Sequence, residues 1–237
     1  MNENQNQSPA QLKALARTSL TGKYPFMIGV LLVSSVIFSL FSMPLSMGGG
    51  IVSYLFSFFA SFLRELFLLH IYRINLLVCC RQPATIRDLL LGNPEHEKEM
   101  QTVYAACLMA VIQFLCILPA NLLGSFYQSS GSAALFLGTC ILYTLGLLIY
   151  VCIYISIFPI YFLTADCPAA TIGDTVKMSF YLSKGNRFRL LYLMVSFLPL
   201  LLLSLLSCGI GLLWIIPYMN ATLTHFYLKL ASTKSAG

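Results

Sequence analysis

The residue pair with the greatest chemical potential in this sequence, Arg64-Glu65, lies inside a long apolar stretch that begins at Ile51. At about 1.5 Å per helical residue the pair lies roughly 20 Å along that stretch. If the stretch spans a bilayer, each ionisable side chain there costs about 2.5–3.5 kcal/mol on insertion scales. One hypothesis is a buried site in which Arg64 holds an anion and Glu65 tunes or pairs it. The alternative is that the helix is shifted outward by a turn, or that both side chains snorkel and pair with a neighbouring helix.

Further polar residues follow the pair along the same stretch. At 100° per residue, Asn75 falls within about 20° of Arg64, whereas His70 and Arg73 share another face. A polar track toward the cytoplasm is therefore one prediction for this helix. Arg73 is expected at the inner headgroups in either case.

Catalytic and metal-binding patterns are weak. His96 lies in a Glu-His-Glu-Lys-Glu run, which has no second histidine at the spacing of a zinc protease. The preceding Asn93-Pro94-Glu95 is typical of a capped helix start. His225 is interpreted as an ordinary interfacial histidine. With no nucleophile–base set, phosphate loop or haem motif, we expect a non-enzymatic protein without metal or cofactor.

The composition indicates the solvent of the elements that position these residues. The 237-residue chain is 58% hydrophobic and only 9% charged, with a mean hydropathy of +0.82. A soluble domain carries about 25% charged residues, so a cytosolic enzyme, a disordered tail and a secreted disulfide scaffold are all excluded. The eight cysteines are expected to be free thiols, and the net charge of +6 indicates anionic lipid rather than nucleic acid.

Six apolar runs are long enough to span a membrane, which predicts an all-α polytopic helical bundle. These runs are Phe26–Met43, Ile51–Tyr72, Val103–Leu123, Ala133–Leu163, Leu190–Ser207 and Ile210–Tyr227. The fourth run, about 46 Å long as a helix, exceeds a hydrocarbon core of about 30 Å. It must tilt, kink at Pro159 or extend into the cytoplasm.

The basic residues indicate the orientation. Of the 14 lysines and arginines, all but Arg64 and Arg73 fall in alternate connections, whereas 43–50, 124–132 and 208–209 carry no charge. Under the positive-inside rule both termini are cytoplasmic. The predicted organisation is one membrane domain: a cytoplasmic amphipathic segment (1–25), six spans (26–227) and a short cytoplasmic tail (228–237).

The cytoplasmic segments suggest a threefold repeat of a short amphipathic helix that ends at glycine. The predicted units are Pro9–Gly22, Pro83–Gly92 and Pro168–Gly185. The apolar stripe of the first unit would consist of Leu12, Leu15 and Leu20, with Lys13 and Arg17 facing away from it. The stripe of the second unit would consist of Ile86, Leu89 and Leu90. The stripe of the third would consist of Ile172, Val176 and Phe180. Such helices are expected to lie in the headgroup layer, each preceding a pair of spans.

Proline interrupts four of the runs, at Pro119, Pro159, Pro199 and Pro217. Each removes one backbone donor and frees a carbonyl. Broken helices of this kind can line transporter sites, but kinking without a ligand is the favoured interpretation.

The C-terminal third carries a distinctive pattern. It contains Lys184-Gly185, then Gly209-Ile-Gly211-Leu-Leu-Trp214-Ile-Ile-Pro217-Tyr218, and later Phe226-Tyr227. This pattern resembles a bacterial integral-membrane family, the domain of unknown function 975. The resemblance implies a multi-pass protein of the bacterial inner membrane, and it implies no activity.

One function is therefore expected, with an alternative from a different class. In the first, the protein organises anionic lipid or another membrane protein at the cytoplasmic face. In the alternative, it transports a small molecule or ion through the polar site at Arg64 and Glu65. A polar cavity reaching Arg64 would favour transport, and paired side chains in a packed bundle would favour the first function.

Overall fold

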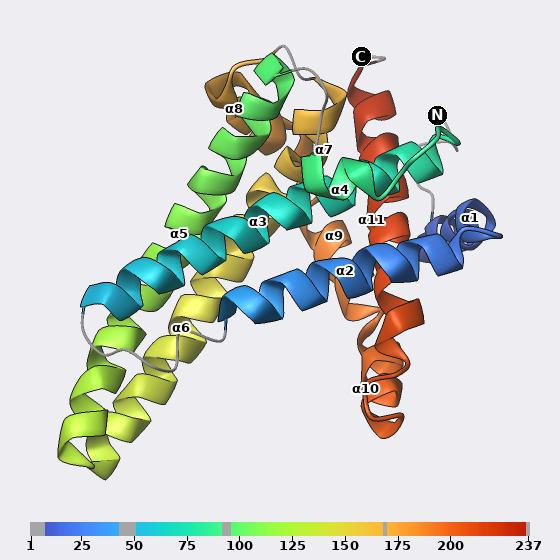
Figure 1. The fold of residues 1–237 in the computed structure, drawn as a ribbon. Coiled ribbons are helices and arrows are strands. Elements are labelled where there is room, and N and C mark those ends of the chain that lie inside the picture. Colours follow the sequence, from blue (N-terminus) through green and yellow to red (C-terminus); the bar gives the residue numbers. More distant parts are fainter. Residues whose placement is uncertain (1–7, 43–50, 92–95, 168–169, 236–237) are drawn as a thin grey trace.

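A computed structural model describes residues 8–42, 51–91, 96–167 and 170–235. The chain is 86% helical, and no strand occurs in these ranges, which confirms the all-α prediction. The helices, shown in Figure 1, are α1 (Pro9–Leu20), α2 (Tyr24–Ser42), α3 (Ile51–Cys79), α4 (Arg87–Leu91), α5 (His96–Ser130), α6 (Ala133–Ile157), α7 (Ile160–Asp166), α8 (Ile172–Ser183), α9 (Arg187–Val195), α10 (Leu198–Leu206) and α11 (Leu212–Ser235).

Four segments are long and apolar enough to cross a membrane, fewer than the six that were predicted. They are Val52–Cys79, Met100–Ser130, Ala133–Asp166 and Arg187–Leu206. A fifth is possible by the same criterion if α1 and the first part of α2, which meet at 92°, form one broken span. The polar side chains within α11 lower its mean hydropathy, so this helix is not among the four candidate membrane spans.

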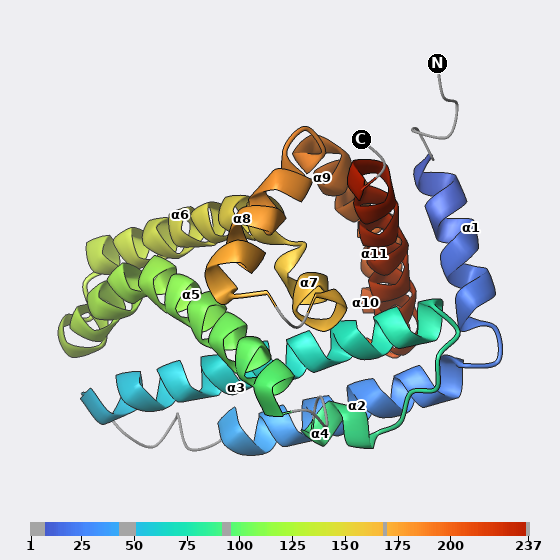
Figure 2. The ribbon, with the colours of Figure 1, turned by 90° about the horizontal axis from the view of Figure 1, so that it is seen from above.

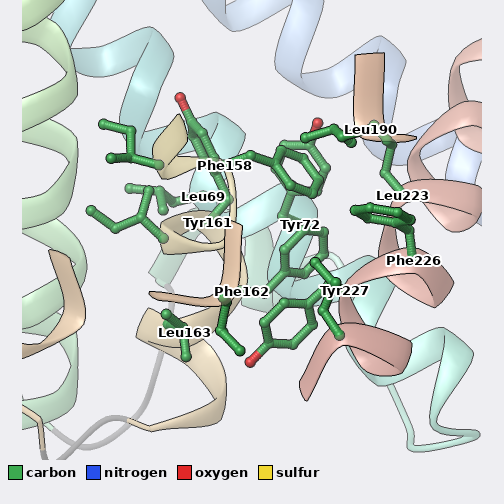
Figure 3. Packing of buried hydrophobic residues seen from close by; sticks show 14 of the residues in the cluster. Leu69, Tyr72, Phe158, Tyr161, Phe162, Leu163, Leu190, Leu223, Phe226 and Tyr227 are labelled. Atoms are coloured by element: carbon green, nitrogen blue, oxygen red, sulfur yellow. The ribbon is translucent and has the colours of Figure 1, made fainter. Parts of the chain in front are cut away.

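The short helix α7 forms the centre of the molecule. In Figure 2 it lies among α3, α5, α8 and α11, and it packs against the first three of these. Two turn residues, Phe158 and Pro159, interrupt the helix between α6 and α7 while keeping right-handed helical dihedrals. A kink at Pro159 was one of the three alternatives predicted for this long run. Four consecutive α7 side chains, from Ile160 to Leu163, are buried, and Figure 3 shows their aromatic members facing Tyr72 and Tyr227. An apolar core therefore surrounds the break.

One helix–turn–helix unit occurs twice. After α1, Thr21 has φ/ψ of −56°/123° and Gly22 has φ of +77°; after α8, Lys184 has −61°/123° and Gly185 has +83°. Both pairs have the geometry of a type II turn, which requires a positive φ at the second central residue and therefore favours glycine there. A hydrogen bond from Lys23 N to Leu20 O (2.9 Å) closes the first turn. The predicted repeat is thus clear between the first and third units, whereas α4 is only five residues long.

The amphipathic stripes of these units differ from the predicted ones. In α1 the buried residues are Leu12, Ala16 and Leu20, while Leu15 is exposed. In α8 the equivalent positions are Thr175, Ser179 and Ser183, also buried, while the predicted stripe residue Phe180 is exposed. The small side chains of this stripe let the helix approach its neighbours closely, which a count of large apolar residues does not detect.

The four prolines have different effects. Pro119 and Pro217 lie inside the continuous helices α5 and α11. The helix is instead interrupted just before Pro199, between α9 and α10. At this second break the Lys13 ammonium donates to the Ser196 carbonyl at 3.0 Å. A cation from the first helix thus satisfies a carbonyl at the break in the predicted fifth span.

Candidate functional site

The Arg64-Glu65 pair joins four helices in the interior of the molecule. The Arg64 Nη2 atom lies 2.6 Å from Glu65 Oε1 and also donates to the Gln113 side chain of α5. Glu65 Oε2 accepts from the Tyr161 hydroxyl of α7 at 2.8 Å, and Oε1 accepts from the Tyr150 hydroxyl of α6 at 3.4 Å. The carboxylate therefore has a cation and two hydroxyls as partners.

The two charged side chains lie in different environments. The Glu65 side chain is 0% exposed, whereas that of Arg64 is 40% exposed. Burial of a carboxylate is costly unless it is paired and hydrogen-bonded, and Glu65 satisfies both conditions. The pairing alternative of the sequence analysis describes Glu65, while Arg64 keeps an accessible edge.

That edge lines an opening between α2 and α3, here called the α2–α3 hollow. Its volume is about 260 Å³. Its lining residues are Ser34, Ser35, Phe38, Arg64, Phe67, Leu68 and Ile71. The Ser34 and Ser35 hydroxyls donate to the carbonyls of Leu31 and Leu32, both at 2.9 Å. Within the hollow, Arg64 is thus the main donor, the serine oxygens present lone pairs, and the remaining wall is apolar.

The other predicted polar residues of α3 have separate partners. The His70 Nδ1 atom lies 2.9 Å from the Leu89 carbonyl of α4, and Asn75 Nδ2 donates to the Ile71 carbonyl of its own helix at 2.8 Å. Arg73 lines a different opening, about 250 Å³, together with Gln82 and Asp166. The structure thus places these three residues in surroundings distinct from the Arg64-Glu65 pair.

Three members of the network at Glu65 were missed by the sequence analysis. Gln113, Tyr150 and Tyr161 each carry one polar group within an otherwise apolar run. The signal that identified Arg64, a polar group expected at membrane depth, applies to them too, because such groups require partners. Their convergence brings together three different helices and was not predictable from spacing within one helix.

A third opening lies at the corner between α8 and α9 and is here called the α8–α9 hollow. Its volume is about 370 Å³, and it is lined by Phe180, Tyr181, Lys184, Gly185 and Arg187. Next to it, Phe188 is 88% exposed. Two cations and two aromatic rings therefore converge on a turn next to a large unburied apolar side chain.

The two cations of α1 pack against the C-terminal helices, contrary to the prediction that they face away. Besides its bond to the break before Pro199, Lys13 Nζ lies 4.3 Å from the centre of the Phe197 ring. The Arg17 Nε atom donates to the Tyr218 hydroxyl at 3.2 Å. Burial and the nearby charge of Arg17 lower the pKa of the Lys13 ammonium. Helix α1 is therefore held to the bundle by specific polar contacts as well as by its apolar stripe.

The motif residues of the C-terminal third have mainly structural surroundings. Gly209 has φ of +85°, and a Cβ at Gly211 would approach Ser204 Cβ to 2.9 Å, so the turn before α11 requires both glycines. Trp214 is half-exposed and Pro217 lies within α11. The Tyr218 hydroxyl accepts the hydrogen bond from Arg17 Nε described above.

The motif ends with two aromatic residues in the core. The Tyr227 hydroxyl donates to Asp166 Oδ2 at 2.7 Å, and its ring stacks on Phe162 with centroids 4.7 Å apart (Figure 3). The Phe226 ring lies 6.0 Å from the guanidinium of Arg189. This part of the motif therefore joins α11 to α7 and α9.

The fold and these contacts describe an all-helical protein with four candidate membrane spans, in which an ion pair with a fully buried carboxylate is joined to several helices. The chain belongs to the family described as "Protein of unknown function (DUF975)", whose family model matches residues 1–234. No curated protein and no solved structure matches the chain.

Proposed function

We propose that this protein is a non-enzymatic component of a bacterial inner membrane that binds anionic phospholipid headgroups at the cytoplasmic face. The observation that carries the proposal is the α8–α9 hollow, where Lys184 and Arg187 flank Gly185 beside two aromatic side chains. Basic residues near a membrane surface contribute about 1 kcal/mol each toward anionic lipid. Exposed aromatic side chains are enriched at membrane interfaces.

In this proposal the chain crosses the membrane six times, with both termini in the cytoplasm. The four apolar candidates account for the second to fifth spans, and α2 and α11 complete the set. In Figure 1 the C-terminal part of α11 lies at the top of the view and the α5–α6 and α10–α11 connections lie at the bottom, while α2 and α3 run across the view. The uncharged connections 131–132 and 207–211 are then external, as the positive-inside rule requires.

The lining residues of the α8–α9 hollow suit a phosphate-bearing headgroup. Arg187 can present a planar fork to phosphate oxygens and Lys184 a point charge. A Cβ placed at Gly185 would meet no atom within 4 Å, so the space beside the turn is open. Phe188 would lie among the acyl chains while the two cations stay at headgroup level.

The proposal is tested by native mass spectrometry of the full chain in mild detergent with added phosphatidylglycerol or phosphatidylcholine. The variant Lys184→Gln/Arg187→Gln should retain phosphatidylglycerol about thirtyfold more weakly than the wild type, since two contacts of about 1 kcal/mol each are removed. Lys177→Gln is the matched control, because Lys177 is exposed on α8 but does not line the hollow.

Two results would overturn this assignment. One is equal retention of the two lipids by the wild type. The other is a loss of phosphatidylglycerol retention in the Lys177→Gln control as large as the loss in the double variant. Inorganic phosphate added to the complex should leave the lipid bound; displacement by phosphate would identify a soluble anion as the ligand instead.

The transport alternative has less support from the geometry. The hollow that reaches Arg64 has a largely apolar wall, and Glu65 lies behind it with all of its surface buried. This arrangement favours a binding site for an apolar molecule over a polar route across the membrane.

A further inference from the structure

We infer that the α2–α3 hollow binds an uncharged, membrane-dissolved lipid that carries both an ester carbonyl and a free hydroxyl, as in a diacylglycerol. This site is separate from the α8–α9 hollow and does not depend on it. The argument rests on which donors, acceptors and charges line the hollow.

The charge of the site argues against an anionic ligand. Among the described residues that line the hollow, Arg64 is the one cation, and Glu65 already neutralises it at 2.6 Å. A carboxylate or phosphate entering the hollow would leave an uncompensated negative charge in a region of low dielectric constant, which is strongly unfavourable. A neutral ligand avoids this cost.

The hydrogen-bonding groups of the hollow specify the polar part of such a ligand. The two bonds from Arg64 to Glu65 and Gln113 both use Nη2, and the Arg64 side chain as a whole remains 40% exposed. A guanidinium has five N–H donors and no acceptor, so it suits a carbonyl oxygen. The Ser34 and Ser35 oxygens donate within α2 and retain lone pairs, so they suit a ligand hydroxyl.

The remaining wall and the size of the hollow specify the apolar part. Phe38, Phe67, Leu68 and Ile71 surround the polar groups, and a volume of about 260 Å³ lies just below the usual range for whole small-molecule sites. A glycerol ester with the first part of one acyl chain fits this description, and the rest of the acyl chains would extend into the bilayer. The occupant is therefore a lipid held by its neutral head.

Native mass spectrometry of the full chain in detergent, with dioleoylglycerol as the probe, tests the inference. Ser35→Phe fills the hollow from α2 and should lower dioleoylglycerol retention at least tenfold. Ser39→Phe is the matched control: Ser39 is exposed one turn further along α2 and does not line the hollow, so retention should stay within twofold of the wild type.

Two chemically altered probes test the polar assignment without changing the protein. Oleic acid under ionising conditions should bind at least tenfold more weakly than dioleoylglycerol, and so should trioleoylglycerol, which lacks the hydroxyl. Equal or tighter binding of oleic acid would overturn the neutral-ligand argument, and unchanged retention in Ser35→Phe would overturn the location. Dioleoylglycerol binding should persist in Lys184→Gln/Arg187→Gln, which separates this inference from the proposed function.

Discussion

Replacement of Glu65 by alanine should destabilise the protein more than any other single change in the polar network described above. The substitution removes the acceptor of Arg64, Tyr161 and Tyr150 at once. Breaking a buried ion pair by removing one partner costs about 3–5 kcal/mol. Because the Arg64 side chain is 40% exposed, it can relax outward, and we expect the lower end of that range, about 3 kcal/mol.

The loss is measurable as a change in apparent melting temperature in detergent. For chains of about this length, 1 kcal/mol corresponds to roughly 2–4 °C, so Glu65→Ala should lower Tm by about 6–12 °C. The assay is the fraction of monodisperse protein remaining after heating, followed by size-exclusion chromatography. Tyr161→Phe removes one hydrogen bond to a charged group and should cost about 1.5–3 kcal/mol.

The double variant Arg64→Met/Glu65→Leu separates the cost of an unpaired charge from the cost of lost packing. Replacing both members of a buried pair by apolar residues is often neutral, so the double variant should recover more than half of the Tm lost in Glu65→Ala. A Glu65→Ala change below 2 °C would refute the reasoning. So would a double variant as unstable as the single one.

Three further outcomes are expected from particular contacts. Gly146→Ala should cost about 1–3 kcal/mol in thermal melts, since its Cβ would lie 2.3 Å from the Cys116 carbonyl oxygen and force α5 and α6 apart; an unchanged Tm would contradict this packing. Gly185→Ala should cost about 1–2 kcal/mol because its φ is +83°, and stabilisation would argue against the turn. In whole cells an impermeant maleimide should label a variant whose only cysteine is Cys208. A variant whose only cysteine is Cys167 should be labelled only after the cells have been permeabilised. Burial raises the pKa of the Cys167 thiol, so its labelling rate should rise about tenfold per pH unit from pH 7 to 9; the reverse sidedness would overturn the proposed topology.

The sequence predicted the helical class and the turn shared by the first and third repeat units, and it offered a kink at Pro159 as one of three alternatives, because each of these depends on local signals. Hydropathy alone identifies apolar runs, and glycine after an amphipathic stretch identifies a turn. The number of helices that meet the criteria for a membrane span was harder to predict from the sequence. Helix α11 combines an apolar start with buried polar residues such as Asn220 and Thr222, so one hydropathy threshold includes it and another does not.

The candidate site was predictable only in part. An ion pair at membrane depth is visible in the sequence, and Glu65 proved to be fully buried. Its partners Gln113, Tyr150 and Tyr161 come from three other helices, α5, α6 and α7. Such tertiary convergence depends on how the helices pack, and residue spacing within one helix carries no information about it.

The repeated unit shows how one local design can serve two purposes. When Gly22 is aligned with Gly185, Arg17 corresponds to Phe180. Arg17 donates to Tyr218 and holds α1 to the bundle, whereas Phe180 is exposed and lines the α8–α9 hollow. The N-terminal copy therefore uses its cations for internal contacts, and the C-terminal copy presents aromatic and basic side chains outward. Both copies share the turn, while the side chain one turn before it contacts the bundle in the first copy and lines an open hollow in the second.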